Sequence, residues 1–323
     1  MKKLSFLLVA ILLCTTSFGK IWRVNNVPGT TADFTTVQAA NDNISVLPGD
    51  TIHLESSTTG YGNLTMTKKL TIISIGDFLA ANAGVEYAVV PGRMGAVSIS
   101  NAAAAGSVFH CNITSTVSVT NVSNLRFERC HIESSLTFSG SSNNTILQNY
   151  LYSVTFTSSS NNIVSNNIIE YILDVNATAS ATVTNNVLFA QNATTGRPMQ
   201  NSTFQNNIIN KNGGFAFTNT VVENNITTNA LLPAGNGNQN GVVMTNVFVN
   251  PNGTDDASFK LQTAIANPAQ GAGVGGTDCG AYGGTSPLKP GLQAAIPAIY
   301  KLTAPATPSG STMNITFSTR SNN

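Results

Sequence analysis

A five-residue phrase recurs about every nineteen residues through the middle of this chain. It reads as an apolar residue, any residue, Asn or Cys (Thr in the last copy), a fourth residue that is usually Asn, and an aliphatic residue. The copies are Phe109–Ile113, Leu147–Leu151, Val164–Ile168, Val183–Val187, Phe204–Ile208, Val222–Ile226 and Val243–Val247, with an irregular copy at Glu128–Ile132. The fourth positions, 17 to 21 residues apart, are Asn112, His131, Tyr150, Asn167, Asn186, Asn207, Asn225 and Asn246. Such a period is typical of one structural unit stacked on copies of itself.

The repeat predicts a parallel β-helix. Short runs of Thr, Ser, Val, Ile and Phe between the copies favour strands, and Asn favours the turns between them because it tolerates left-handed backbone angles. Each strand would pair in parallel with the strand one period later, and stacked Asn amides would form an internal ladder. We therefore expect an all-β solenoid with coils of about 19 residues. Leu is too scarce for a leucine-rich solenoid, and a propeller needs a period of ~40 residues.

The composition excludes some classes of partner. Only 9% of the residues are charged, whereas an average soluble protein has about 25%. The net charge is +1, and Lys and Arg form no cluster. Binding to nucleic acid or to a membrane surface depends on clustered basic residues. We therefore expect no nucleic-acid partner.

Residues 1–19 have the pattern of a secretory signal peptide. Lys2 and Lys3 give a positive start, residues 4–14 form an apolar run, and residues 17–19 resemble a cleavage site. The run is too short for a stable membrane anchor, and no later segment is longer and as apolar. We expect the mature chain to be secreted or displayed at the cell surface, as a monomer without a transmembrane anchor.

Two regions are expected after the signal peptide. Residues 20–284 would form the β-helix domain, and residues 285–323 a linker with a short β tail. An amphipathic helix over residues 33–45, with Phe34, Val37 and Ile44 on its apolar face, would cap the open end of the stack. Near the other end, residues 259–265 are expected to form the last strands.

Two cysteines occupy the same position in consecutive copies of the phrase. Cys111 and Cys130 are nineteen residues apart, so stacking would place their Cα atoms ~4.8 Å apart. That distance lies within the ~4.4–6.8 Å range of disulfides. The alternative is two buried thiols in the ladder. Cys279 has no evident partner.

The beginning of the repeat region resembles a known family. The segments Asp33–Asp42, Pro48–Leu54 and Leu64–Ile73 are similar to the first coils of right-handed parallel β-helix proteins of the pectate-lyase-like superfamily, which a short helix caps. The segment Asp278–Gly284 resembles the closing segment of many secreted bacterial β-helix proteins. The resemblance covers about residues 30–285 and implies a right-handed coil. It implies no single activity, because this superfamily includes lyases, hydrolases and esterases.

The residues needed for polysaccharide cleavage are sparse. Elimination on a uronic-acid chain needs a strong base and carboxylates that hold Ca²⁺, and hydrolysis needs carboxylates at defined separations. Residues 95–250 contain few acids, and none of the sequence motifs of pectin hydrolases occurs there. We therefore expect no intact catalytic site, no metal site and no cofactor; Ca²⁺ has no support from the sequence.

Polar and charged residues nevertheless gather in three consecutive coils. His110, Arg129 and Gln148 each precede the Asn or Cys of their copy, so stacking would bring them onto one surface able to grip a sugar acid. The candidate ligand-binding residues are His110, Arg129, Gln148 and Tyr150, and the candidate catalytic residues are Arg126, Arg129, Glu133 and His131. The alternative is a solvated ion-pair group, which contributes little energy.

The sequence thus favours a secreted β-helix that binds polysaccharide or a cell-surface glycan without catalysing a reaction. A divergent lyase or glycoside hydrolase built around Arg126, Arg129 and Glu133 is the second hypothesis. A structural spacer without a ligand is the third.

Overall fold

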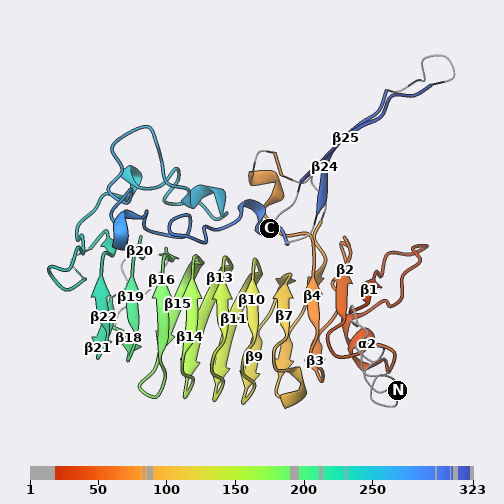
Figure 1. The fold of residues 1–323 in the computed structure, drawn as a ribbon, viewed down its shortest axis with the longest axis horizontal. Coiled ribbons are helices and arrows are strands. Elements are labelled where there is room, and N and C mark those ends of the chain that lie inside the picture. The colour runs from red at the N-terminus through yellow and green to blue at the C-terminus, as the bar shows by residue number, and fades with distance from the viewer. Residues whose placement is uncertain are drawn as a thin grey trace, which may run out of the picture.

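A computed structural model of the chain describes residues 19–82, 84–85, 90–189, 196–210, 214–229, 231–294, 297–305, 307 and 312–320. Apart from Gly19, the predicted signal peptide lies outside these residues. The chain winds as an all-β parallel solenoid with coils of about 19 residues (Figure 1), which confirms the predicted fold class. None of the helices in the described ranges is long and apolar enough to cross a membrane.

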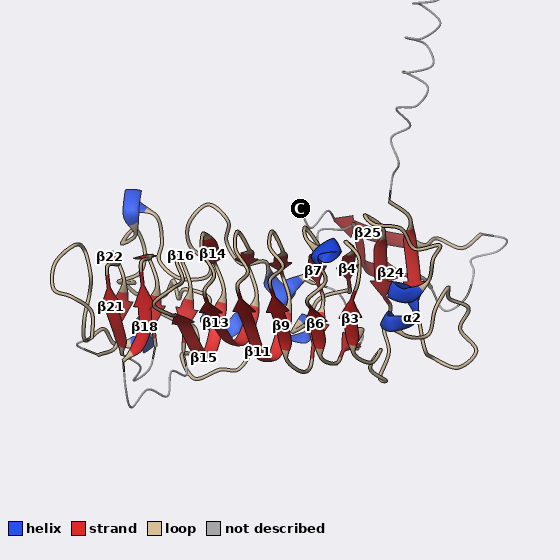
Figure 2. Cartoon of the chain, turned by 90° about the horizontal axis from the view of Figure 1, so that it is seen from below, coloured by secondary structure: helices blue, strands red, loops and turns tan. Residues whose placement is uncertain are grey.

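Two parallel sheets run the length of the solenoid. The ten-stranded sheet contains, in order, β1 (Ile21–Val24), β2 (Thr51–Leu54), β4 (Thr71–Ile73), β7 (Val108–His110), β10 (Arg126–Glu128), β12 (Thr145–Leu147), β14 (Asn162–Ser165), β16 (Ala181–Thr184), β19 (Thr203–Gln205) and β22 (Val221–Glu223). The thirteen-stranded sheet contains β3 (Leu64–Met66), β6 (Val97–Ile99), β9 (Val117–Thr120), β11 (His131–Ser139), β13 (Tyr150–Thr157), β15 (Ile168–Val175), β17 (Val187–Leu188), β20 (Ile208–Ile209) and β23 (Ile226–Thr227), joined by β5 (Arg93–Met94), β8 (Asn112–Ile113), β18 (Arg197–Gln200) and β21 (Phe215–Thr218). Seen from below, the coils lie side by side along the long axis (Figure 2).

In each of these coils, one apolar side chain of the ten-stranded sheet points into the interior of the coil. The paired residues of this column are Phe109, Phe127, Ile146, Val164, Val183, Phe204 and Val222. Stacking continues the apolar contact from coil to coil; the ring centroids of Phe109 and Phe127, for example, are 4.7 Å apart. Because each coil buries its apolar residues only against its neighbours, stability is built up one coil at a time.

The predicted Asn ladder exists, but its register differs from the prediction. Tyr150 pairs with Ile168, not with Asn167. The ladder consists of Cys130, Asn149, Asn167, Asn186, Asn207, Asn225 and Asn238, and each backbone N–H donates to the side-chain oxygen of the next Asn. The fourth positions of the early copies, among them His131 and Tyr150, belong to the next column. The predicted last marker, Asn246, lies in the 3₁₀ helix η3 (Met244–Asn246) and is exposed.

A left-handed residue precedes each ladder position from Cys130 to Asn225. These residues, with φ between 54° and 57°, are Arg129, Gln148, Asn166, Asn185, Asn206 and Asn224. The coil of Phe109 has one residue fewer at this turn than the next coil: Asn112 lies three positions after Phe109, whereas its partner His131 lies four positions after Phe127, the partner of Phe109. This difference explains why the phrase is irregular at Glu128–Ile132.

The N-terminal helix α2 is shorter than predicted. It spans Val37–Asp42, with Thr36 as its N-cap, and buries Val37 and Ala40 against the first coils. The predicted span of 33–45 was wrong at both ends: Phe34 pairs with Val24 as an isolated bridge, and Ile44 is 87% exposed. The chain is already extended at Asn43, which ends the helix.

After the last coil the chain turns back along the solenoid. We call residues 242–294 the C-terminal strap; it lies along one edge of the strands (Figure 1). The strap contains η3, η4 (Ala257–Phe259), η5 (Val274–Gly276) and η6 (Pro290–Leu292), so the strands predicted at 259–265 are absent from this described stretch. Beyond it, β24 (Ala298–Thr303) and β25 (Thr316–Arg320) form an antiparallel hairpin, as expected for the β tail.

The strap encloses a second apolar core outside the coil. Tyr150, Ile168, Val187, Ile208 and Ile226 point away from the coil interior. They are covered by strap residues, among which are Met244, Val247, Phe248, Phe259, Cys279, Ala281, Leu288 and Leu292. The aliphatic column read from the later copies of the phrase therefore belongs to this outer core.

Candidate functional site

Three of the four predicted ligand-binding residues are covered by the strap. Arg129, Gln148 and Tyr150 are 4%, 4% and 3% exposed. Nε2 of Gln148 donates to the carbonyl oxygens of Ser286 and Pro287, at 3.1 and 2.9 Å. A guanidinium N–H of Arg129 donates to the carbonyl oxygen of Gln293, at 3.1 Å. These polar groups are thus engaged by the chain itself and offer a glycan no free face.

The column of left-handed residues that includes Arg129 and Gln148 contacts the strap along its whole length. Proceeding along the coils, the side chains of Asn166, Asn185, Asn206 and Asn224 bond to the backbone of Ala281 and Gly283, Asp278, Val274 and Ala272. The strap partners run in reverse order, because the strap returns antiparallel to the stack. The left-handed column is therefore a structural seam.

The predicted catalytic residues belong to two groups. In the first, Nε of Arg126 lies 2.7 Å and Nε of Arg129 3.6 Å from the carboxylate oxygens of Glu128. Burial raises the pKa of Glu128, but the hydrogen bond and charge of Arg126 outweigh it and leave this pKa below its ordinary value. Nδ1 of His110 lies 2.8 Å from the backbone oxygen of Glu128, and burial lowers the pKa of His110, which favours the neutral ring. This group is an ion-pair cluster on the ten-stranded sheet.

The second group joins His131 and Glu133 to residues that the sequence analysis missed. Nδ1 of His131 lies 2.7 Å from Oδ2 of Asp77, and a terminal nitrogen of Arg93 lies 3.6 Å from the same oxygen. The other terminal nitrogen of Arg93 lies 3.4 Å from Oε1 of Glu133. Burial raises the pKa of Asp77, but the hydrogen bond from His131 outweighs it, so that the pKa is lowered. The His131 ring also contacts Phe78, with centroids 4.8 Å apart.

Asp77 and Phe78 lie in an excursion of the chain between β4 and β5, and Arg93 follows it as the first residue of β5, paired with Asn112. No phrase marks this excursion, and Asp77 is 54 residues from His131. In the sequence this excursion is visible only as an interruption of the period. The interruption does not indicate which residues the excursion contacts.

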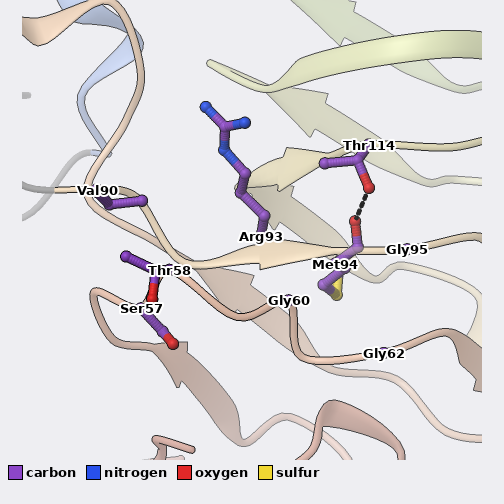
Figure 3. A pocket seen from close by; sticks show the side chains of 9 residues that line it. All are labelled: Ser57, Thr58, Gly60, Gly62, Val90, Arg93, Met94, Gly95 and Thr114. Atoms are coloured by element: carbon purple, nitrogen blue, oxygen red, sulfur yellow. Dashed lines mark hydrogen bonds between the residues drawn. The ribbon is translucent and has the colours of Figure 1, made fainter. Parts of the chain in front are cut away.

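Arg93 separates two surface pockets. The larger, of about 440 Å³, is lined by Ser57, Thr58, Gly60, Gly62, Val90, Arg93, Met94, Gly95 and Thr114. Figure 3 shows Arg93 rising from β5 between Val90 and Thr114, whose hydroxyl donates to the Met94 carbonyl oxygen at 3.0 Å. The second pocket, of about 310 Å³, is lined by Asp77, Phe78, Leu79, Ala80, Val90, Pro91 and Arg93.

A stacked pair of tyrosines, of which Tyr152 is exposed and Tyr171 half-buried, lies at the bend next to Glu133. At this bend the strands differ by one residue between two consecutive paired positions. β13 has one unpaired residue, Tyr152, whereas β11 has two, Glu133 and Ser134, and β15 has two, Glu170 and Tyr171. The Tyr152 and Tyr171 rings are stacked, with centroids 5.2 Å apart and planes at 19°. Because β13 lies between β11 and β15, Tyr152 stands between the coil of Tyr171 and the coil of Glu133.

We call Arg93, Glu133, Tyr152 and Tyr171 the corner row. The side chains of Arg93 and Glu133 are 38% and 36% exposed, and Tyr152 is 37% exposed. The row thus combines a guanidinium, a carboxylate and an aromatic face, all accessible to a ligand. No group of three or more His, Cys, Asp or Glu side chains suited to a metal ion occurs within the described ranges.

The three cysteines within the described ranges, Cys111, Cys130 and Cys279, are buried free thiols in the structure.

Comparisons with protein-family models, with curated proteins and with solved structures gave no match. The parallel β-solenoid fold therefore rests on the structure, and the resemblance to the pectate-lyase-like superfamily stays a prediction.

Proposed function

We propose that this chain is an exported carbohydrate-binding module whose corner row holds a stretch of polysaccharide. One observation carries the proposal: Tyr152 stacks on Tyr171 at the bend where β13 pairs with β11, the strand of Glu133, and Glu133 is paired with Arg93. The apolar face of a pyranose ring stacks on aromatic rings, while carboxylate and guanidinium groups bond its hydroxyls. An aromatic ring beside a polar pair is therefore suited to one sugar residue.

The solenoid suits a ligand longer than one sugar. Neighbouring coils are ~4.8 Å apart, similar to the length of one pyranose unit in an extended polysaccharide. Beyond Arg93 the row continues into the larger pocket, lined partly by the hydroxyls of Ser57, Thr58 and Thr114. An extended glycan running along the coils would thus meet new polar groups at successive coils.

A glycan array with the purified chain, followed by titration with the oligosaccharides that bind, tests the proposal. Removing the ring in Tyr152→Ala should weaken binding about ten-fold, the usual effect of truncating a central aromatic contact. Tyr152→Phe keeps the ring and should bind nearly as the parent does. Binding that is equal in the parent and in Tyr152→Ala would move the site elsewhere, and an empty array would favour the structural spacer.

Catalysis is a second candidate, favoured by the pair of His131 and Asp77. A carboxylate bonded to Nδ1 orients an imidazole and leaves Nε2 for proton transfer. Assays for reducing ends and for the absorbance of unsaturated uronates would detect hydrolysis and elimination. Product release that disappears in His131→Ala and persists in Tyr152→Phe would establish an enzyme, whereas binding without product supports the module.

A further inference from the structure

The charges around the corner row are predominantly negative. Glu133 and Glu170 lie on either side of Tyr152, on the two coils that flank it. Asp77 adds a third carboxylate, and the pKa of this group is lowered, which keeps it ionised at neutral pH. A ligand held against Tyr152 would therefore lie among carboxylates.

The neighbouring cations are already paired. Arg93 lies 3.6 Å from Asp77 and 3.4 Å from Glu133, so that its single positive charge is shared by two carboxylates. Along the same sheet, Arg197 lies 3.5 Å from Asp174. A carboxylated sugar would have to compete with these side chains for either guanidinium. It would also bring its own charge near Glu133 and Glu170, well within the ~8 Å over which charges act at physiological salt.

We propose that the corner row binds uncharged sugars and discriminates against carboxylated ones, an inference that rests on the proposed function. Hydroxyl groups suit the site because they donate to the free lone pairs of Glu133 and accept from N–H groups of Arg93 without breaking their ion pair. The sugar ring contributes apolar contact with Tyr152, which is independent of charge. Selectivity then comes from repulsion of the wrong ligand as much as from attraction of the right one.

Titration of the full chain with oligosaccharides of equal length tests this inference. The neutral probes are hexamers of β-1,4-linked glucose, xylose and mannose, and the carboxylated probe is hexagalacturonate. The parent should bind at least one neutral hexamer about ten-fold more tightly than hexagalacturonate, because like charges in contact oppose binding. Glu170→Gln, which removes a carboxylate beside Tyr152 that is not part of the corner row, should narrow this gap by tightening hexagalacturonate binding, with little change for the neutral hexamer.

Glu223→Gln, which removes a carboxylate at the far end of the ten-stranded sheet, is the matched control and should leave both affinities unchanged. Tighter binding of hexagalacturonate than of every neutral hexamer by the parent, weakened by added salt, would overturn the inference and leave the proposed function standing. Failure to bind any of the four probes, together with an empty glycan array, would overturn the proposed function as well.

Discussion

The thiol of Cys130 donates to the carbonyl oxygen of Phe109, at 3.2 Å. In the following coils an Asn amide makes the equivalent contact: Nδ2 of Asn149 donates to the Phe127 oxygen, and Nδ2 of Asn167 to the Ile146 oxygen, each at 2.9 Å. Cys130 is thus a member of the ladder in which a thiol replaces the amide.

A substitution in the middle of the ladder should be costly. Oδ1 of Asn186 accepts from the backbone N–H and from Nδ2 of Asn167, at 3.0 and 2.9 Å. Nδ2 of Asn186 donates to the carbonyl oxygen of Val164. Asn186→Ala leaves these buried groups without partners, at about 1–3 kcal/mol each. We expect the free energy of unfolding in urea to fall by about 3–5 kcal/mol.

Asn252→Ala, in an exposed loop of the strap, is the control for that experiment. It should change the free energy of unfolding by no more than about 0.5 kcal/mol. Equal effects of the two substitutions would show that the ladder does not stabilise the coils.

Cys130 allows the ladder to be extended by one amide. Cys130→Ala removes the thiol contact with Phe109 and leaves a small cavity, so it should lower the free energy of unfolding by about 1–2 kcal/mol. Cys130→Asn restores a donor to Phe109 and should be more stable than Cys130→Ala. The reverse order in urea unfolding would mean that the neighbouring Cys111 coil has no room for an amide.

The attachment of the strap depends on the left-handed column. Asn166 donates to the carbonyl oxygens of Ala281 and Gly283, at 3.0 and 2.8 Å. Asn166→Gly keeps the left-handed turn, because glycine adopts positive φ without strain, but removes both contacts. We expect faster amide hydrogen exchange in residues 272–293, by about ten-fold for each 1.4 kcal/mol of local stability lost.

Asn124→Gly is the matched control, since Asn124 also has positive φ but is exposed at the opposite turn of its coil. It should leave exchange in residues 272–293 unchanged. Faster exchange in both variants would trace the effect to the turns, not to the contacts with the strap.

The sequence predicts the solenoid well because its signal is local and repeated. Each copy of the phrase holds the turn, the ladder residue and the strand that follows. The register is harder to read, because two adjacent columns both accept aliphatic residues. Ile168 ends its copy of the phrase yet pairs with Tyr150, which stands one position earlier in its own copy, so an alignment on the last residue slips by one.

The site is predicted less well because its residues come from distant parts of the chain. Gln148 looked available for a ligand, since nothing in its own coil occupies it, but its partners Ser286 and Pro287 lie 138 and 139 residues away. The sequence hypothesis grouped Glu133 with Arg126 and Arg129, whereas in the structure those two arginines pair with Glu128 and Glu133 pairs with Arg93. Arg93 precedes the first copy of the phrase, and the bulge between β11 and β13 sets Tyr152 opposite both Glu133 and Ser134, which no pattern in the sequence marks.

Two buried carboxyl groups should give opposite contributions to the pH dependence of stability. Asp256 is buried and accepts from Asn82 and from the Gly291 N–H, each at 2.7 Å. Burial raises the pKa of Asp256 in spite of these hydrogen bonds and of the charge of Lys260. For Asp77, burial also acts upward, but the hydrogen bond from His131 prevails and the pKa is lowered.

The signs follow from proton binding. A raised pKa means that the folded chain binds the Asp256 proton more tightly, so this group adds stability as the pH falls through its folded-state pKa toward the unfolded value of about 3.9. A lowered pKa means that Asp77 adds stability above about pH 3.9, which is lost as the pH falls further through its folded-state pKa. The measurement is urea unfolding of the parent, Asp256→Asn and Asp77→Asn from pH 7 downward.

Each variant removes one titrating carboxyl group. The difference between the unfolding free energies of the parent and the variant therefore reports on that group alone. The stability of the parent relative to Asp256→Asn should rise between neutral pH and about pH 4. Relative to Asp77→Asn it should stay level over that range and then fall at lower pH. A parent that loses stability relative to Asp256→Asn on mild acidification would mean that its hydrogen bonds hold this carboxyl ionised, and that burial is not the stronger influence.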